Sequence, residues 1–117
     1  MTEIYELPEG KILIGFSDEK LSLGLLVLNP GQALPKHDRP IKEQLVQVSG
    51  TSTIKMFNKE SFLKDVVLNE GESLEMPSNQ LHIHCNQTKE KSITMWKFES
   101  NIIEKIESIK NNYKRIL

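Results

Sequence analysis

Apolar side chains recur in short runs through residues 11–98, and Gly, Pro, Asn and Ser residues separate these runs. Some runs alternate between apolar and polar positions, and others are continuously apolar. Both patterns are expected of β-strands. Many short strands separated by turn residues are typical of an all-β sandwich or barrel. The predicted strands cover residues 11–16, 21–28, 44–48, 51–57, 62–68, 74–76, 81–86 and 92–98.

Two regions depart from this pattern. Residues 1–10 are expected to form a lead-in to the sheet. Residues 32–42 contain Pro35 and Pro40, and proline cannot donate a hydrogen bond to a neighbouring strand. We therefore expect irregular or edge backbone between the second and third predicted strands.

The hydrophobic period changes near residue 101, where apolar side chains begin to recur at helical spacings of three and four. Asn101 and Glu104 have the spacing of a capping box, which starts a helix by satisfying its free N–H groups. The pattern predicts one amphipathic helix over residues 101–116, lying on the sheet or on a second subunit. Its apolar stripe comprises Ile102, Ile103, Ile106, Ile109, Tyr113, Ile116 and Leu117.

The length of 117 residues predicts a single domain over 1–117, with a barrel over about 11–98 and the helix after it. The formal net charge of -1 provides no basic field for nucleic acid or for an anionic membrane. The single cysteine, Cys85, excludes an internal disulfide. No apolar run is long enough to span a membrane, and the N-terminus lacks signal-peptide features. We therefore expect a cytoplasmic protein.

The three histidines of the chain lie in two segments that each begin with glycine, residues 31–50 and residues 71–86. Alternate residues of a strand share one face. His37 and Arg39 should therefore point the same way, and so should His82 and His84. Lys36 and Asp38 have the opposite parity, so we expect them in solvent.

The first segment resembles the first motif of the cupin superfamily. That motif reads Gly, five residues, His, one residue, His, three or four residues, Glu, six residues, Gly. Gly31, His37, Glu43 and Gly50 match it, whereas Arg39 replaces the second histidine.

The second segment resembles the second cupin motif, which reads Gly, five residues, Pro, one residue, Gly, two residues, His, three residues, Asn. Gly71, Pro77, His82 and Asn86 match it. Asn79 stands at the glycine position, where its tolerance of positive φ makes the exchange acceptable.

The resemblance implies a single-domain cupin-like jelly-roll β-barrel, all-β apart from the C-terminal α-helix. It implies that His37, Glu43 and His82 converge inside the barrel as metal ligands, with His84 as a candidate fourth. Two imidazoles and a carboxylate suit iron, zinc, manganese, nickel or copper. Small cupins resembling this chain usually form homodimers, here with residues 21–28 or the helix contributing to the interface.

Arg39 is the main departure from the family pattern, because a guanidinium stays charged and cannot coordinate a cation. It has three alternative placements. Arg39 can swing outward and leave a three-ligand metal site, or it can pair with Glu43 in a site without metal. It can also point into the cavity and bind an anionic substrate, whose carboxylate or phosphate its planar fork suits.

Simpler structural roles exist for most of these residues. The histidines can be buried side chains that only satisfy hydrogen bonds of the barrel, and Glu43 can pair with Arg39 or Lys42. Cys85 should face away from the histidines as a small buried hydrophobe. Met95, Trp96 and Phe98 are expected in the core or in a subunit contact, and Asn79 and Asn86 in turns.

Two functional hypotheses follow. The first is a metal-dependent enzyme, an oxygenase or isomerase, that acts on a small anionic molecule oriented by Arg39. The second is a non-catalytic, metal-free barrel that binds or senses a small molecule, with Arg39 and Glu43 as its polar anchor.

Overall fold

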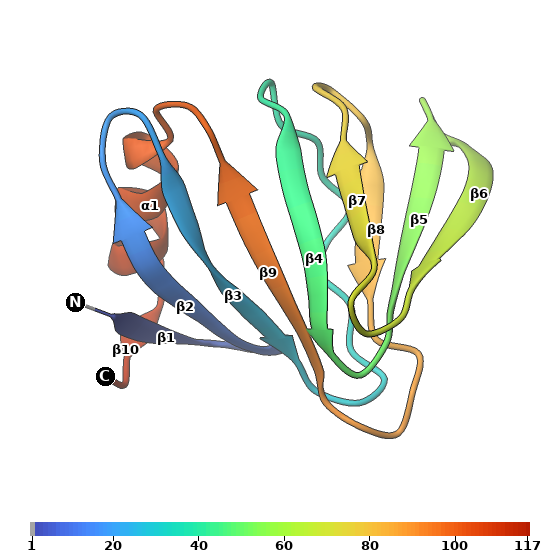
Figure 1. Ribbon diagram of the computed structural model, residues 1–117, viewed down its shortest axis with the longest axis horizontal. Coiled ribbons are helices and arrows are strands. Elements are labelled where there is room, and N and C mark those ends of the chain that lie inside the picture. The colour runs from blue at the N-terminus through green and yellow to red at the C-terminus, as the bar shows by residue number, and fades with distance from the viewer. Residues whose placement is uncertain (1) are drawn as a thin grey trace.

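The computed structural model describes residues 2–117, which form ten strands and one helix (Figure 1). The elements are β1 (Glu3–Leu7), β2 (Gly10–Ser17), β3 (Ser22–Leu28), β4 (Glu43–Ser49), β5 (Ser52–Asn58), β6 (Ser61–Leu68), β7 (Ser73–Met76), β8 (His82–Cys85), β9 (Ser92–Phe98), α1 (Ile103–Asn112) and β10 (Lys114–Arg115).

The strands form two sheets that face each other in a jelly-roll arrangement (Figure 1). The larger sheet has the order β10-β1-β2-β3-β9-β4-β7, and the smaller has the order β6-β5-β8. All pairs of named strands are antiparallel. Strand pairing within residues 2–117 does not join the two sheets into a closed barrel, so the predicted barrel is an open, two-sheet jelly roll.

The eight predicted strands are confirmed as β2 to β9, with no bound shifted by more than one residue. The irregular segment between β3 and β4 is also confirmed. It contacts β8 through two isolated bridges, which pair Ala33 with Cys85 and His37 with His82. Because Pro35 and Pro40 carry no N–H, this segment cannot form a continuous ladder.

The predictions for the two ends of the chain are wrong in part. Residues 3–7 form β1 rather than a lead-in, so the sheet begins before residue 11. The helix ends at Asn112, and β10 follows it in place of a further helical turn. The cause is tertiary: β1 presents a free backbone edge, and Tyr5 and Glu6 pair there with Arg115 and Lys114.

The core lies between the sheets and under α1. It includes Tyr5, Leu28, Ile54 and Trp96, which are almost completely buried. Ile102, at the N-cap of α1, and Ile106 join this core. The first part of the predicted apolar stripe therefore packs within the chain, whereas Tyr113, Ile116 and Leu117 are exposed.

Asn101 accepts a hydrogen bond from the Ile103 N–H at 3.1 Å. The N-cap is Ile102, however, with no side-chain capping hydrogen bond in the described chain, so the predicted capping box of Asn101 and Glu104 is not formed.

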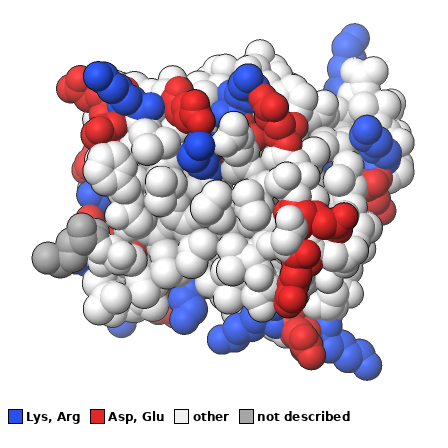
Figure 2. All heavy atoms as spheres, viewed as in Figure 1, with Lys and Arg blue, Asp and Glu red and all other residues white. Residues whose placement is uncertain are grey.

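Charged side chains of both signs intermix around the margin of the face shown in Figure 2, and the middle of that face is largely uncharged. This mixed distribution agrees with the net charge of -1. Within residues 2–117, α1 is too short and too polar to cross a membrane.

A homodimer stays a prediction. β3 pairs with β2 on one side and with β9 on the other. Its backbone hydrogen-bonding groups are therefore used within the sheet, and only its outer face remains for a contact with a second subunit.

Gly24 provides a test of the packing around Trp96, its partner across β3 and β9. A Cβ atom at Gly24 would overlap the Leu13 carbonyl oxygen and lie 2.5 Å from Cζ2 of Trp96. We expect Gly24→Ala to lower the free energy of unfolding by about 2 kcal/mol or more, because the added methyl group forces the backbone of Leu13 and the ring of Trp96 out of their packed positions. Urea denaturation followed by tryptophan fluorescence measures the change.

Gly15→Ala is the matched control, since a Cβ there would meet only ordinary contacts, the nearest at 3.4 Å. It should change the free energy of unfolding by less than about 1 kcal/mol. Equal stability of the two variants would contradict the close approach of β3 to Trp96.

Candidate functional site

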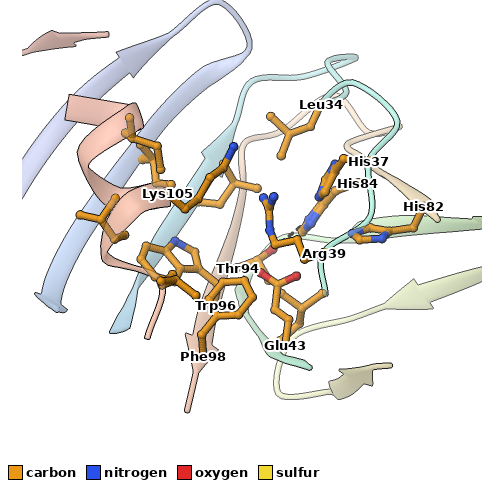
Figure 3. A pocket seen from close by; sticks show the side chains of 16 residues that line it. Leu34, His37, Arg39, Glu43, His82, His84, Thr94, Trp96, Phe98 and Lys105 are labelled. Carbon is orange, nitrogen blue, oxygen red and sulfur yellow. Dashed lines mark hydrogen bonds between the residues drawn. The ribbon is translucent and has the colours of Figure 1, made fainter. Parts of the chain in front are cut away.

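A pocket opens between the two sheets and is partly covered by α1 (Figure 3). Its apolar lining comes mainly from β2, β3, β9 and the helix. The polar and charged side chains that line it are His37, Arg39, Glu43, His82, His84, Thr94 and Lys105, together with the indole of Trp96. The structure thus brings all five predicted site residues to one cavity, while their functional roles stay predictions.

His37 and His82 meet because their backbones form a reciprocal pair. The His37 N–H donates to the His82 carbonyl oxygen at 3.0 Å, and the His82 N–H donates to the His37 carbonyl oxygen at 2.9 Å. Residues paired in this way across antiparallel strands project to the same face. The imidazole ring centroids are consequently 4.3 Å apart, with the ring planes tilted by 60°.

The two rings share one hydrogen-bonding arrangement. Nδ1 of His37 lies 2.9 Å from the Pro35 carbonyl oxygen, and Nδ1 of His82 lies 2.7 Å from that of Gln80. A carbonyl only accepts hydrogen bonds, so each Nδ1 carries the proton and each Nε2 keeps a free lone pair. Burial lowers the pKa of His37 to about 4 and also lowers that of His82, so both rings are neutral near pH 7.

His84 has a different environment. Its Nε2 lies 3.0 Å from Oγ of Ser52 and 3.3 Å from Oγ1 of Thr94. Thr94 in turn donates to Oε1 of Gln47 at 2.7 Å. Burial, the largest cause, lowers the pKa of His84 to about 3. This nitrogen is already engaged in a hydrogen-bond network between the sheets, whereas those of His37 and His82 are free.

Glu43 is the first residue of β4, and only 9% of it is exposed. Burial raises the pKa of its carboxyl to about 7, and the positive charge of Arg39 only partly opposes this rise. None of the ion pairs within residues 2–117 involves Glu43. Glu43 is therefore close to half-protonated at neutral pH.

Arg39 lines the same pocket, two residues beyond His37. Its backbone carbonyl accepts a hydrogen bond from the Asn79 N–H at 2.7 Å, which fixes the two motifs against each other. The guanidinium carbon lies 5.9 Å from the Phe98 ring centroid, and Nε is buried without a hydrogen-bond partner in the described chain. The ion pair with Glu43 considered from the sequence is not formed among residues 2–117.

The donor chemistry of His37 and His82 fits a divalent transition metal. Both imidazoles are neutral, each has a free Nε2, and each is oriented by a hydrogen bond from Nδ1 to a backbone carbonyl, as metal-bound histidines commonly are. Residues 2–117 contain no group of three His, Cys, Asp or Glu side chains arranged to hold a metal ion. As arranged, the chain therefore offers two nitrogen ligands, with the Glu43 carboxyl in the same pocket.

The surrounding residues mostly occupy the expected environments. Lys36 and Asp38 are exposed, and Cys85 is buried, which raises the pKa of its thiol. Asn79 takes a φ of 61°, as its place at the cupin glycine position predicts. Asn86 donates to the carbonyl oxygens of Leu28 at 3.1 Å and Glu90 at 2.7 Å, so it stabilises a turn.

Lys105 and the indole N–H of Trp96 line the pocket, although neither was predicted as part of the site. Lys105 follows Ile102 by three residues and precedes Ile109 by four, so helical spacing places it on the same face as the apolar stripe. That spacing was the available signal for Lys105. For Trp96 the sequence predicts only a place in the core or in a subunit contact, because an apolar strand does not reveal where an indole nitrogen points.

A pH series on Glu43→Gln tests the burial of this carboxyl. With a pKa of about 7 in the folded state and 4.5 when unfolded, the neutral carboxyl is favoured by folding, and this stabilisation is lost as the pH rises from 4.5 through 7. We expect Glu43→Gln to raise the free energy of unfolding at pH 8 by up to about 3 kcal/mol. The gain should disappear at pH 4.

Chemical denaturation of chelator-treated protein at both pH values measures this gain, and Glu75→Gln, an exposed carboxyl on β7, serves as the control. A loss of stability in Glu43→Gln at pH 8 would instead indicate an ion pair with Arg39.

No protein-family model matches the sequence, and no curated protein is similar to it in sequence. The fold, by contrast, resembles many solved structures. An oxalate oxidase in complex with glycolate superposes with a TM-score of 0.62 at 21% identity, over 69% of this chain and 42% of the oxidase. The chain thus spans less than half the length of that enzyme.

Two further structures support the same fold. Oxalate decarboxylase from Bacillus subtilis gives a TM-score of 0.73 at 20% identity, over 82% of this chain and 27% of the decarboxylase. A Klebsiella pneumoniae protein with a double-stranded β-helix domain gives 0.67 at 17% identity, over 76% of this chain and 75% of its own. The chain therefore shares the double-stranded β-helix fold of these structures, in agreement with the jelly roll that the resemblance of its two motifs to cupins implies.

Proposed function

We propose that this protein is a metal-dependent cupin that binds a divalent metal ion at His37 and His82 and a small anionic molecule beside them. The observation that carries the proposal is the pair of neutral imidazoles, 4.3 Å apart, in the pocket that also contains Arg39. Glu43 is the candidate third ligand and His84 a candidate fourth.

The imidazoles support the metal part of the proposal. A metal ion competes with protons for an imidazole lone pair, so the low pKa values of His37 and His82 favour binding near pH 7. A bound cation would also favour the ionised form of Glu43, whose carboxyl is close to half-protonated without it. The metal, when bound, supplies the ability to polarise a substrate oxygen or to bind dioxygen.

The side chains around the imidazoles have distinct tasks in this proposal. The guanidinium of Arg39 binds and orients the negative group of the small molecule. Glu43, ionised beside the cation, supplies the candidate third ligand. The aliphatic lining of the pocket excludes water and so strengthens both electrostatic interactions. Together, the two imidazoles, Arg39 and Glu43 favour an oxygenase or isomerase reaction on a small acid.

Two structural neighbours support the same combination of ligands. The oxalate oxidase was solved with glycolate, described as a substrate analogue, which is a small carboxylate. The Bacillus subtilis oxalate decarboxylase contains Mn(II) centres. Among the metals considered, manganese is therefore the first to test here, followed by iron, zinc, nickel and copper.

A metal-free binding or sensing barrel is the second candidate. It is favoured by the absence, within residues 2–117, of a three-ligand cluster. The positive charge of Arg39 near the imidazoles also favours it, because a cation repels a metal ion in a partly dry pocket.

Metal analysis of the purified full chain separates the two candidates. After incubation with each metal and removal of the excess, we expect a stoichiometric ion that His37→Ala and His82→Ala each bind at least about tenfold more weakly. Asp38→Asn is the control, because Asp38 is exposed and follows His37 directly in the chain. This variant should retain the ion. Protein that stays metal-free after incubation with all five metals would overturn the metal-dependent proposal and favour the metal-free barrel.

A further inference from the structure

Two buried nitrogen donors without acceptors and one solvent-exposed ammonium face one part of the pocket. The indole Nε1 of Trp96 and Nε of Arg39 are both buried without a hydrogen-bond partner in the described chain. Lys105, from α1, has no ion pair among residues 2–117. Figure 3 shows these side chains around one space, on the helix side of the histidines.

The charges around this space do not balance. Arg39 and Lys105 are both cationic, and the charge of Arg39 helps to lower the pKa of the Lys105 ammonium, after burial as the larger cause. Glu43 is the one acidic side chain in the lining drawn from the described residues. Even when its carboxyl is ionised, one negative charge faces two positive charges, so the pocket lining has an excess of positive charge.

An anion would satisfy all three donors. A buried N–H group without an acceptor is unfavourable, and two cations that share a partly dry cavity repel each other. The planar guanidinium matches a carboxylate, and an ammonium and an indole N–H can donate to oxygen from other directions. Trp96 is only 5% exposed, so bulk solvent has little access to its indole nitrogen.

The rest of this part of the pocket is aliphatic. Side chains from β2, β3, the segment before His37 and the helix supply this surface: Ile12, Leu26, Leu34, Ile102, Ile106 and Ile109. A hydrated inorganic anion would leave it uncovered, whereas the hydrocarbon part of a small acid would bury it.

We propose that Lys105 and Trp96 Nε1 join Arg39 in a subsite for the carboxylate of a small aliphatic acid, with the hydrocarbon part packed against the isoleucines of α1. This inference builds on the proposed function only in placing the small molecule in this pocket. The C-terminal helix thereby contributes a positioning and specificity-determining residue, Lys105, to a site whose other polar side chains come from the sheets and their loops.

The only tryptophan in the chain provides a direct reporter. The indole N–H of Trp96 gives a single assigned side-chain signal in ¹H–¹⁵N NMR spectra of the chelator-treated full chain. We expect saturable shifts of this signal with 4-methylpentanoate, and binding at least about tenfold weaker for the uncharged 4-methylpentanamide. Acetate should also bind at least about tenfold more weakly, since each buried methylene contributes about fourfold in affinity.

Substitutions in α1 test whether Lys105 is a cation that binds the carboxylate. Lys105→Met should weaken 4-methylpentanoate binding about tenfold, and Lys105→Arg should retain most of it. Lys110→Met is the matched control on the same helix, because Lys110 pairs with Glu3 at 3.4 Å and does not line the pocket. Its affinity should equal that of the wild type, and thermal unfolding confirms that each variant is folded.

Several results would overturn the inference. Equal binding of the acid and the amide, no saturable shift with the acid, or an unchanged affinity in Lys105→Met would each exclude the carboxylate subsite and leave water as its occupant. Inorganic phosphate binding more tightly than 4-methylpentanoate would exclude an aliphatic acid.

The test of carboxylate binding does not depend on whether the protein binds a metal ion. Carboxylate binding in chelator-treated protein and in His82→Ala would support the subsite even if no metal binds. Conversely, metal bound at His37 and His82 without carboxylate binding would leave the metal-dependent proposal intact and exclude this inference alone.

Discussion

The reciprocal backbone hydrogen bonds between His37 and His82 hold the two motifs of this chain together. The segment before β4 contains two prolines and forms no continuous ladder with β8, so this bridge and the one at Ala33 fix its position. A slip of one residue would turn one imidazole away from the other, because side chains alternate between faces along a strand. The geometry of the site therefore depends on strand register.

Burial then decides which protonation states the site presents. It lowers the pKa values of the histidines and raises that of Glu43. The same pocket contains Arg39, which remains a cation whatever its surroundings. The result is a cavity with neutral imidazoles, a carboxyl that titrates near neutral pH, and an excess of positive charge. These properties suit the binding of an acid more than that of a neutral molecule.

The end of the chain is tied to its beginning, and this connection places the helix over the pocket. β10 pairs with β1, and the Ile116 N–H donates to the Ile4 carbonyl oxygen at 2.8 Å. With Ile102 and Ile106 packed in the core at the other end of the segment, α1 is fixed on both sides. Lys105 thus reaches the cavity from a secured element rather than from a free tail.

The sequence by itself determined eight strands, the existence of the helix, the cupin-like motifs and the shared face of His37 and Arg39, because these depend on local periodicity and turn residues. Only the tertiary structure decided that the last residues join β1, that Trp96 Nε1 lacks a partner and that Lys105 reaches the pocket. These features arise between segments far apart in the chain, where edge pairing and burial outweigh local propensity.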